Sequence, residues 1–128
     1  MQQRIKNLLE HNSLFLALFC TLLILALSMM NMNGVPTIKY NHIDKFEHAF
    51  AYAVMSFFWF VSYQVGKIKI KFLNLVLIII AYGVLIEIMQ WKLTTSRTGD
   101  LLDVMANTIG VVLGCVIFKI LRRLYLQV

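Results

Sequence analysis

Glu87 is a carboxylate near the end of a long apolar run, residues 72–91, which also contains Gln90. It precedes Trp91 by four residues, so in a helix it lies about 6 Å below that end, too deep to act as a cap. Ionisable side chains inside membrane spans usually face the bundle interior or a wet cavity and mark a site. We therefore predict that Glu87 belongs to a functional site, where it would be the base if the protein is catalytic. Gln90 shares its face, and either an interhelical hydrogen bond or a contact to substrate would explain its amide.

A second stripe of reactive side chains precedes this run. Asp44, His48 and Tyr52 recur at every fourth position, which places a carboxylate, an imidazole and a phenol on one helical face. Asp44 is suited to orient His48, and His48 is suited to serve as an acid or base near neutral pH. The alternatives are structural: Asp44 as a helix cap, His48 as a hydrogen-bonded packing residue and Tyr52 as a core or interfacial aromatic.

The segment 97–114 concentrates polar residues in an otherwise apolar part of the chain. Asp100, Asp103 and Asn107 fall on one helical face, and the two carboxylates also have the spacing of an N-cap and a first-turn acid. Arg97 precedes them and offers a guanidinium fork that suits carboxylate or phosphate. Asn107 would lie one to two turns into the helix, where it serves either as an interhelical hydrogen bond or as part of a site.

Six of the polar residues should meet at one depth near the outer side of a membrane, from three helices and one loop: Lys45, His48, Glu87, Arg97, Asp103 and Asn107. The candidate catalytic residues are Glu87, His48 and Asp103, and the candidate ligand-binding residues are Arg97, Lys45, Asp44, Tyr52, Gln90 and Asn107. No H-E-x-x-H motif is present, and His11, His42 and His48 lack metal-ligand spacing. Nucleotide-binding and nucleophile-elbow motifs are also missing, so we predict neither a metal nor a cofactor.

Composition indicates the elements that must position these residues. With 60% hydrophobic and 14% charged residues, the chain is far more apolar than a soluble domain, whose apolar share is about 45–50%. The net charge of +6 is explained by Lys and Arg flanking apolar spans, so we predict no nucleic-acid partner. Cys20 and Cys115 lie within apolar runs, where we expect them to act as small packing residues.

We predict an all-α fold: a polytopic membrane protein built as a bundle of four transmembrane helices. The predicted spans are residues 13–30, 46–66, 72–91 and 100–121, within a single domain 1–128. The first apolar run exceeds a typical secretory h-region of about 7–15 residues, so it should remain as an anchor helix. Gly110 and Gly114 form a small-xxx-small strip in the last span, which favours close contact with another helix.

The distribution of charge predicts the orientation in the membrane. Eight of the twelve Lys and Arg residues fall in the N-terminal segment, the second loop and the C-terminal segment. The positive-inside rule therefore places both termini in the cytoplasm. Five of the six acidic residues fall on the opposite side, with Glu10 as the exception. Any chemistry at the polar residues should then face outward.

The blocks that carry these residues resemble the VanZ-like family of small bacterial membrane proteins, named for a protein associated with teicoplanin resistance. The resemblance lies in Asp44-Lys45-Phe46-Glu47-His48-Ala49-Phe50-Ala51-Tyr52, in Glu87-Ile88-Met89-Gln90, and in Arg97-Thr98-Gly99-Asp100 followed by Asp103, Ala106, Asn107, Gly110 and Gly114. It covers about Asp44–Leu121 and implies that the candidate residues named above are functional. Glu47 departs from the family pattern, in which an apolar residue is expected. The resemblance also implies a multi-pass protein of the bacterial cytoplasmic (inner) membrane.

These features predict a protein that binds or modifies a cell-envelope component at the outer leaflet. The expected partner is a membrane lipid or a lipid-linked peptidoglycan-precursor head group. Arg97 and Lys45 would meet its phosphate or carboxylate, while Glu87 and His48 supply acid–base capacity. The resemblance adds a link to glycopeptide resistance. Two alternatives stay open, a small proton-coupled transporter that uses Glu87 and a structural or partner-binding bundle. A homo-oligomer is compatible with each.

Overall fold

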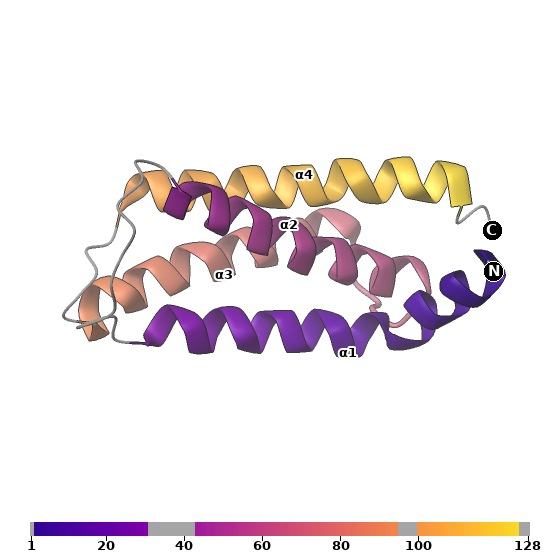
Figure 1. The fold of residues 1–128 in the computed structure, drawn as a ribbon, viewed down its shortest axis with the longest axis horizontal. Coiled ribbons are helices and arrows are strands. Elements are labelled where there is room, and N and C mark those ends of the chain that lie inside the picture. Colours follow the sequence, from indigo (N-terminus) through magenta and orange to yellow (C-terminus); the bar gives the residue numbers. More distant parts are fainter. Residues whose placement is uncertain (1, 31–42, 95–99, 126–128) are drawn as a thin grey trace.

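The computed structural model describes residues 2–30, 43–94 and 100–125. These residues form the helices α1 (Gln2–Met29), α2 (Ile43–Gln64), α3 (Phe72–Leu93) and α4 (Leu101–Tyr125), and they contain no strand. The helices lie lengthwise in an elongated bundle, with α1 and α4 along its two long edges (Figure 1). The prediction of an all-α membrane bundle is confirmed.

The direction of the chain reverses from each helix to the next, and this decides which residues meet. The start of α1, the end of α4 and the turn between α2 and α3 lie at one end of the bundle (Figure 1). The start of α2, the end of α3 and the start of α4 lie at the opposite end. Polar residues at these three helix ends are therefore close in space although they are far apart in the sequence.

Three helices have the length and hydropathy that a membrane span requires. These stretches are Lys6–Met29, Phe72–Leu93 and Leu101–Leu124, and they contain most of the predicted spans 13–30, 72–91 and 100–121. Helix α1 begins at Gln2, earlier than the predicted span, because its polar first turns continue the same helix. Within those turns Gln3 donates a hydrogen bond to Asn7 over 3.2 Å.

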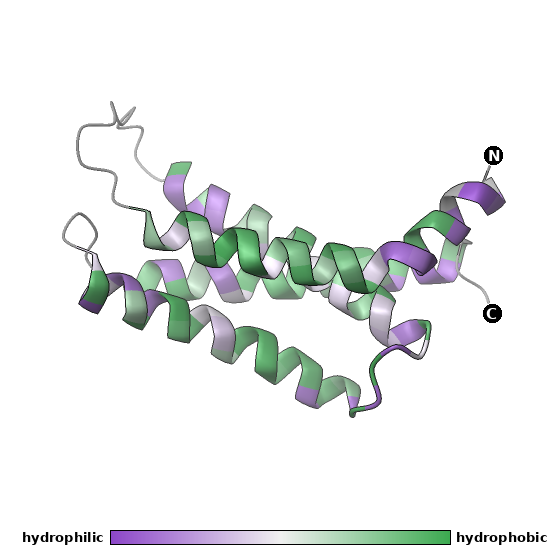
Figure 2. Ribbon diagram, turned by 90° about the horizontal axis from the view of Figure 1, so that it is seen from below, coloured by the Kyte–Doolittle hydropathy of each residue, from purple (hydrophilic) through white to green (hydrophobic). Residues whose placement is uncertain are grey.

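Apolar residues dominate the middle of the bundle, and strongly polar ones gather toward its ends (Figure 2). Large apolar side chains on the outer faces are exposed, among them Phe15 of α1, Leu77 of α3 and Ile109 of α4. Water would disfavour so much exposed apolar surface, whereas the hydrocarbon of a bilayer accommodates it. The exposed faces therefore agree with a chain that crosses a membrane several times.

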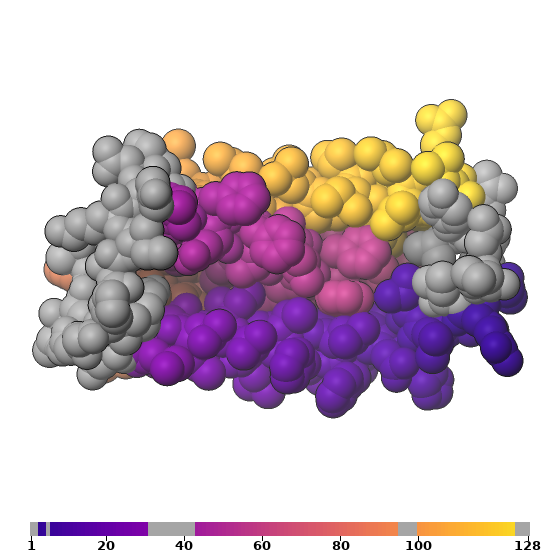
Figure 3. Space-filling model, viewed as in Figure 1, coloured from indigo at the N-terminus to yellow at the C-terminus, as the bar shows by residue number. Residues whose placement is uncertain are grey.

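Helix α2 is not among the helices that are both long and apolar enough to span a membrane. Its first turns carry Asp44, Lys45 and Glu47, which reduce its hydropathy. It packs along α4 and α1, and its side chains lie between theirs on one face of the molecule (Figure 3). A helix that its neighbours cover can hold polar groups that lipid would exclude. The predicted span at 46–66 stays a prediction.

Two glycines bring α4 into close contact with α2. A Cβ atom at Gly110 would lie 2.9 Å from the Cβ of Tyr52 and still closer to the carbonyl oxygen of Ala49. At Gly114 it would lie 2.6 Å from the carbonyl oxygen of Ala53. Backbone atoms cannot move aside as a flexible side chain can, so this contact requires glycine at both positions. The predicted small-residue strip is confirmed as a packing surface.

Candidate functional site

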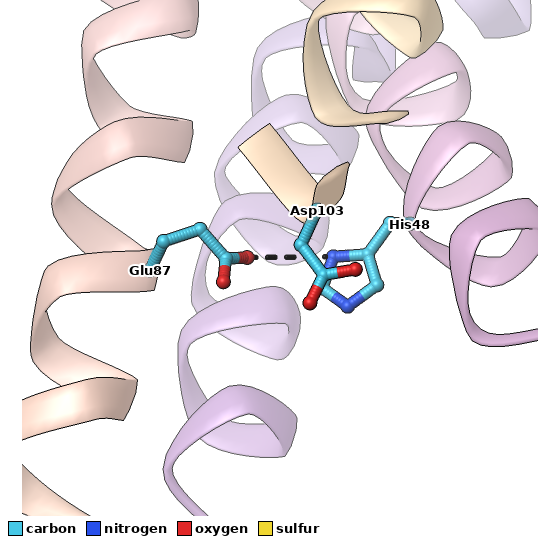
Figure 4. Close-up of side chains that lie close together, drawn as sticks. All are labelled: His48, Glu87 and Asp103. Atoms are coloured by element: carbon cyan, nitrogen blue, oxygen red, sulfur yellow. Dashed lines mark ion pairs between the residues drawn. The ribbon is translucent and has the colours of Figure 1, made fainter. Parts of the chain in front are cut away.

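Three helices contribute the central residues of the site: α2 provides His48, α3 provides Glu87, and α4 provides Asp103. Their side chains point toward one another (Figure 4). Each offers one nitrogen or oxygen atom, and these atoms all lie within 4.8 Å of one another. The helix directions described above explain this meeting, because each residue lies near the same end of the bundle. The predicted convergence of these three residues is observed.

Asn107 connects the imidazole to the buried carboxylate. Its Nδ2 donates to Glu87 Oε1 over 3.3 Å, and its Oδ1 lies 3.0 Å from His48 Nδ1. An ionised Glu87 can only accept hydrogen bonds, so it must face the NH₂ group of the Asn107 amide. The amide oxygen of Asn107 then faces His48. Because an amide oxygen only accepts, His48 Nδ1 must carry a proton in this arrangement. In the neutral imidazole the free lone pair is then on Nε2.

Glu87 is deeply buried, with 4% of its surface exposed. Its Oε1 lies 3.6 Å from His48 Nδ1, while its Oε2 has no hydrogen-bond partner among the described residues. The hydroxyl of Tyr52, which is 1% exposed, also has no partner within the part of the chain described. Buried polar atoms are normally paired, so these two oxygens indicate where a ligand, an ion or water would bind.

The ring of Tyr52 fits against α3 because that helix carries a glycine there. A Cβ atom at Gly83 would lie 3.1 Å from Tyr52 Cε1 and 3.3 Å from Asn107 Cβ. Tyr52 also packs on Tyr82, with ring centroids 6.3 Å apart. Tyr52 is therefore part of the core, as the structural alternative predicted, and its hydroxyl group is the part that remains available to a site.

Lys45 ties the start of α2 to the start of α4. Its ammonium donates to Asp44 Oδ2 and to Asp100 Oδ2, each over 2.9 Å, and also to Asp103 Oδ1. Asp100 caps α4 as predicted, since its Oδ1 accepts a hydrogen bond from the backbone N–H of Leu102 over 2.9 Å. The hydrogen bond from Lys45 lowers the pKa of the Asp100 carboxyl below its ordinary 3.8. Asp100 therefore remains ionised at neutral pH.

Within the described residues the site is acidic. The carboxylates of Asp44, Asp100 and Asp103 contact one ammonium group, that of Lys45, and a fourth carboxylate, that of Glu87, lies near His48 and Asp103. A protonated His48 would reduce this negative charge without cancelling it. The local charge therefore favours a cation over an anion unless another positive group joins the site.

Asp44 and Gln90 differ from the site roles that the sequence predicted. Asp44 lies in the first turn of α2, where Lys45 attracts its carboxylate, and Asn107 takes the predicted place of Asp44 beside His48. Gln90, 2% exposed, donates from Nε2 to the carbonyl oxygen of Ser28 over 3.2 Å. This bond ties α3 to α1, so the interhelical alternative describes Gln90.

Arg97, the predicted anion clamp, belongs to 95–99 and lies outside the described residues. Glu47 is exposed on α2. Asp100 was predicted as a helix cap and left out of the candidate site residues, yet it also binds Lys45. The available signal was its position on the same helical face as Asp103.

Residues 3–122 match the family model described as VanZ/LLP1. No curated protein and no solved structure matches the chain. The family match extends over nearly the whole chain and includes every residue of the site described above. The resemblance predicted from the three polar blocks is thus confirmed, and the chain belongs to the VanZ/LLP1 family.

Proposed function

We propose that this site receives the polar head group of a lipid-linked cell-envelope component at the outer leaflet of the cytoplasmic membrane, and that it binds or modifies it. The observation that carries the proposal is the buried Glu87 carboxylate facing the His48 imidazole near one end of the bundle. A carboxylate and an imidazole at this separation make a proton acceptor and donor pair. A membrane-anchored substrate can approach such a site laterally without leaving the bilayer.

Each residue of the site then has a separate role. Glu87 acts as the base, and His48, held in one tautomer by Asn107, exchanges a proton with the bound head group. Arg97 acts as the anion clamp, since its guanidinium fork pairs with phosphate or carboxylate in two places. Lys45 keeps the starts of α2 and α4 together through Asp100 and Asp103.

The outward orientation rests on the distribution of Lys and Arg, which favours cytoplasmic termini and an outer-leaflet site. Glycopeptides act on envelope precursors outside the cytoplasmic membrane. A protein that binds or alters a precursor head group there would reduce the access of the drug to it. This is the proposed connection between the site and teicoplanin resistance.

The test compares the wild-type chain with Glu87→Gln in a bacterial host. We expect the wild type to lower susceptibility to teicoplanin and to co-purify with lipid-linked precursor, which native mass spectrometry detects. If Glu87 is a general base, its loss should reduce the rate of any modification by about 100- to 10,000-fold. The Glu87→Gln variant should co-purify with less precursor than the wild type, or with precursor whose head group is unmodified.

Glu47→Gln is the matched control, because it makes the same change at an exposed position on α2. It should behave as the wild type does. A Glu87→Gln protein that inserts, melts as the wild type and keeps both the phenotype and the bound precursor would contradict the proposal. If the wild type binds precursor without changing susceptibility, the connection to resistance is wrong and head-group binding stands.

Proton-coupled transport is the second candidate, and the acidic charge of the described site favours it. A cationic substrate would be attracted to these carboxylates, and Glu87 would exchange it for a proton, as carboxylates of pumps do. Adding a cationic drug to purified protein in weak buffer should then release protons from the wild type and not from Glu87→Gln. No release from the wild type would exclude this candidate.

A purely structural bundle is the remaining alternative. Here the polar groups only hold helices together, so Glu87→Gln and Arg97→Gln should lower the melting temperature in detergent. Any phenotype should then fall only in proportion to the amount of folded protein. A variant that loses its phenotype while keeping its melting temperature would exclude this alternative.

A further inference from the structure

The geometry points to a divalent metal site formed by His48, Glu87 and Asp103. One nitrogen or oxygen atom from each lies within 4.8 Å of the other two. Two donors bound to one ion at about 2.1 Å each lie at most about 4.2 Å apart, so small side-chain rotations would close the set around an ion. The inference deepens the proposed function, because it rests on the same site and adds a cation to it.

The three donors have the chemistry of a transition-metal site. One imidazole and two carboxylates form a mixed nitrogen and oxygen set, which suits Zn²⁺, Mn²⁺, Fe²⁺ or Co²⁺. Calcium and magnesium ions prefer oxygen donors alone. Three protein ligands also leave a coordination position open, and catalytic metal sites keep such a position for water or substrate.

The unpartnered oxygen of Glu87 is the second observation that favours an ion. Its side chain is 5% exposed and points toward His48 and Asp103 (Figure 4). Its Oε1 accepts from Asn107, whereas its Oε2 has no hydrogen-bond partner among the described residues. A buried carboxylate oxygen without a donor is costly, and coordination to a cation would satisfy it.

The arrangement around His48 is the one that metal-binding histidines use. Such a histidine donates its second ring N–H to a carbonyl or carboxylate, which fixes the tautomer and the ring direction. Here His48 Nδ1 lies 3.0 Å from Asn107 Oδ1, which can only accept. Nε2 therefore keeps the lone pair, so an ion would bind Nε2 and not Nδ1, the nitrogen that lies 3.6 Å from Glu87 Oε1. Asn107 is then a positioning residue for the metal ligand.

Asp103 can take part while it still binds Lys45. The ammonium of Lys45 contacts Oδ1, so Oδ2 is the oxygen that remains for an ion. A divalent cation would also offset the excess of carboxylates among the described residues. This would allow a phosphate or carboxylate head group to approach a site whose own charge repels it.

The experiment uses the full chain, purified in detergent without a polyhistidine tag and stripped with a chelator. Cobalt(II) is added alone, and its binding is monitored by visible absorption. Manganese(II) is added in a parallel titration, and its binding is monitored by electron paramagnetic resonance. We expect one ion per chain in the wild type. Removing a residue that hydrogen-bonds a metal ligand typically costs about 10- to 100-fold in metal affinity, so Asn107→Ala should show that loss. His48→Gln, Glu87→Gln and Asp103→Asn should lose more.

Two of the ligand variants have a matched control elsewhere in the chain. His11→Gln controls for His48→Gln, since His11 is exposed on α1. Glu47→Gln controls for Glu87→Gln, since Glu47 is exposed on α2. Both controls should bind the ion as the wild type does. Melting curves of the metal-free proteins show which variants are folded.

A wild type that binds neither ion at millimolar concentration would overturn the inference. Equal binding by the wild type and the folded ligand variants would also overturn it, because the ion would then occupy another part of the chain. If a ligand variant does not fold, the other two and Asn107→Ala still decide the question. Metal binding is measured without lipid, so it can fail while precursor binding succeeds, or succeed while precursor binding fails.

Discussion

At the level of single residues, Asn107 controls the state of the site. Its amide donates to Glu87 and accepts from His48, so one group that does not titrate sets the roles of two groups that do. A carboxylate in its place would bind His48 equally well but would repel Glu87. An amide is the side chain of this size that satisfies both neighbours.

This view gives opposite expectations for Asn107 and Glu87 in the metal-free protein. Asn107→Ala removes the partner of a buried carboxylate and of an imidazole, and should destabilise the bundle by about 1–2 kcal/mol. Glu87→Gln removes a buried charge that already has an unpartnered oxygen, and should cause no loss of stability. Unfolding of both variants in detergent, followed by circular dichroism, would measure this. A large loss for Glu87→Gln beside none for Asn107→Ala would contradict the assigned roles.

At the level of elements, the contact between α2 and α4 positions the site. Gly110 and Gly114 allow the helices to approach, and Lys45 joins their first turns through Asp100 and Asp103. The first turns of α2 turn Lys45 and His48 toward the other helices, while Asp44 and Glu47 stay exposed. Helix α3 then supplies Glu87 from the other side. The site thus depends on a close helix pair and on a third helix packed against it.

Gly110 and Gly83 provide a direct comparison of two kinds of close contact. A Cβ atom at Gly110 meets the backbone of Ala49, whereas at Gly83 it meets side-chain atoms of Tyr52 and Asn107. Gly110→Ala should therefore destabilise the protein by about 1–3 kcal/mol. Gly83→Ala should cost less and should mainly disturb the site. Melting temperatures of the two variants test this order, and the reverse order would contradict it.

At the level of the whole molecule, the two ends of the bundle differ in charge. The turn between α2 and α3 carries Lys67, Lys69 and Lys71, and α4 ends near Arg122 and Arg123. The opposite end carries the acidic site. Such an asymmetry favours the basic end in the cytoplasm. In that orientation, a component of the outer leaflet would reach the site.

Cysteine labelling tests this orientation. In a chain with Cys20→Ser and Cys115→Ser, Glu47→Cys lies at the acidic end and Lys69→Cys at the basic end, and both positions are exposed. A membrane-impermeant maleimide added to intact cells should label Glu47→Cys and not Lys69→Cys. Permeabilised cells, in which both should react, are the control. The reverse labelling of intact cells would place the site on the cytoplasmic side.

Composition and local pattern were enough to predict the membrane class, the all-α fold and the helices themselves. Within a bilayer, an apolar run of this length can pair all its backbone N–H and C=O groups only as a helix. Few other folds are therefore compatible with this composition. The small-residue strip and the Asp100 cap were also predictable, because each depends on residues close together in the sequence. The family was also predictable, because three blocks of polar residues occur in a fixed order along the chain.

The partners of the polar side chains were decided by the tertiary structure alone. The sequence placed Asp44 beside His48 by helical spacing, yet Asn107 from another helix occupies that place. The depth of His48, Glu87 and Asp103 in their helices predicted that they converge, but no spacing could predict that their donor atoms lie within 4.8 Å of one another. Helical periodicity reports only which residues share a face of one helix. Which faces meet, and how closely, depends on how the helices pack against one another.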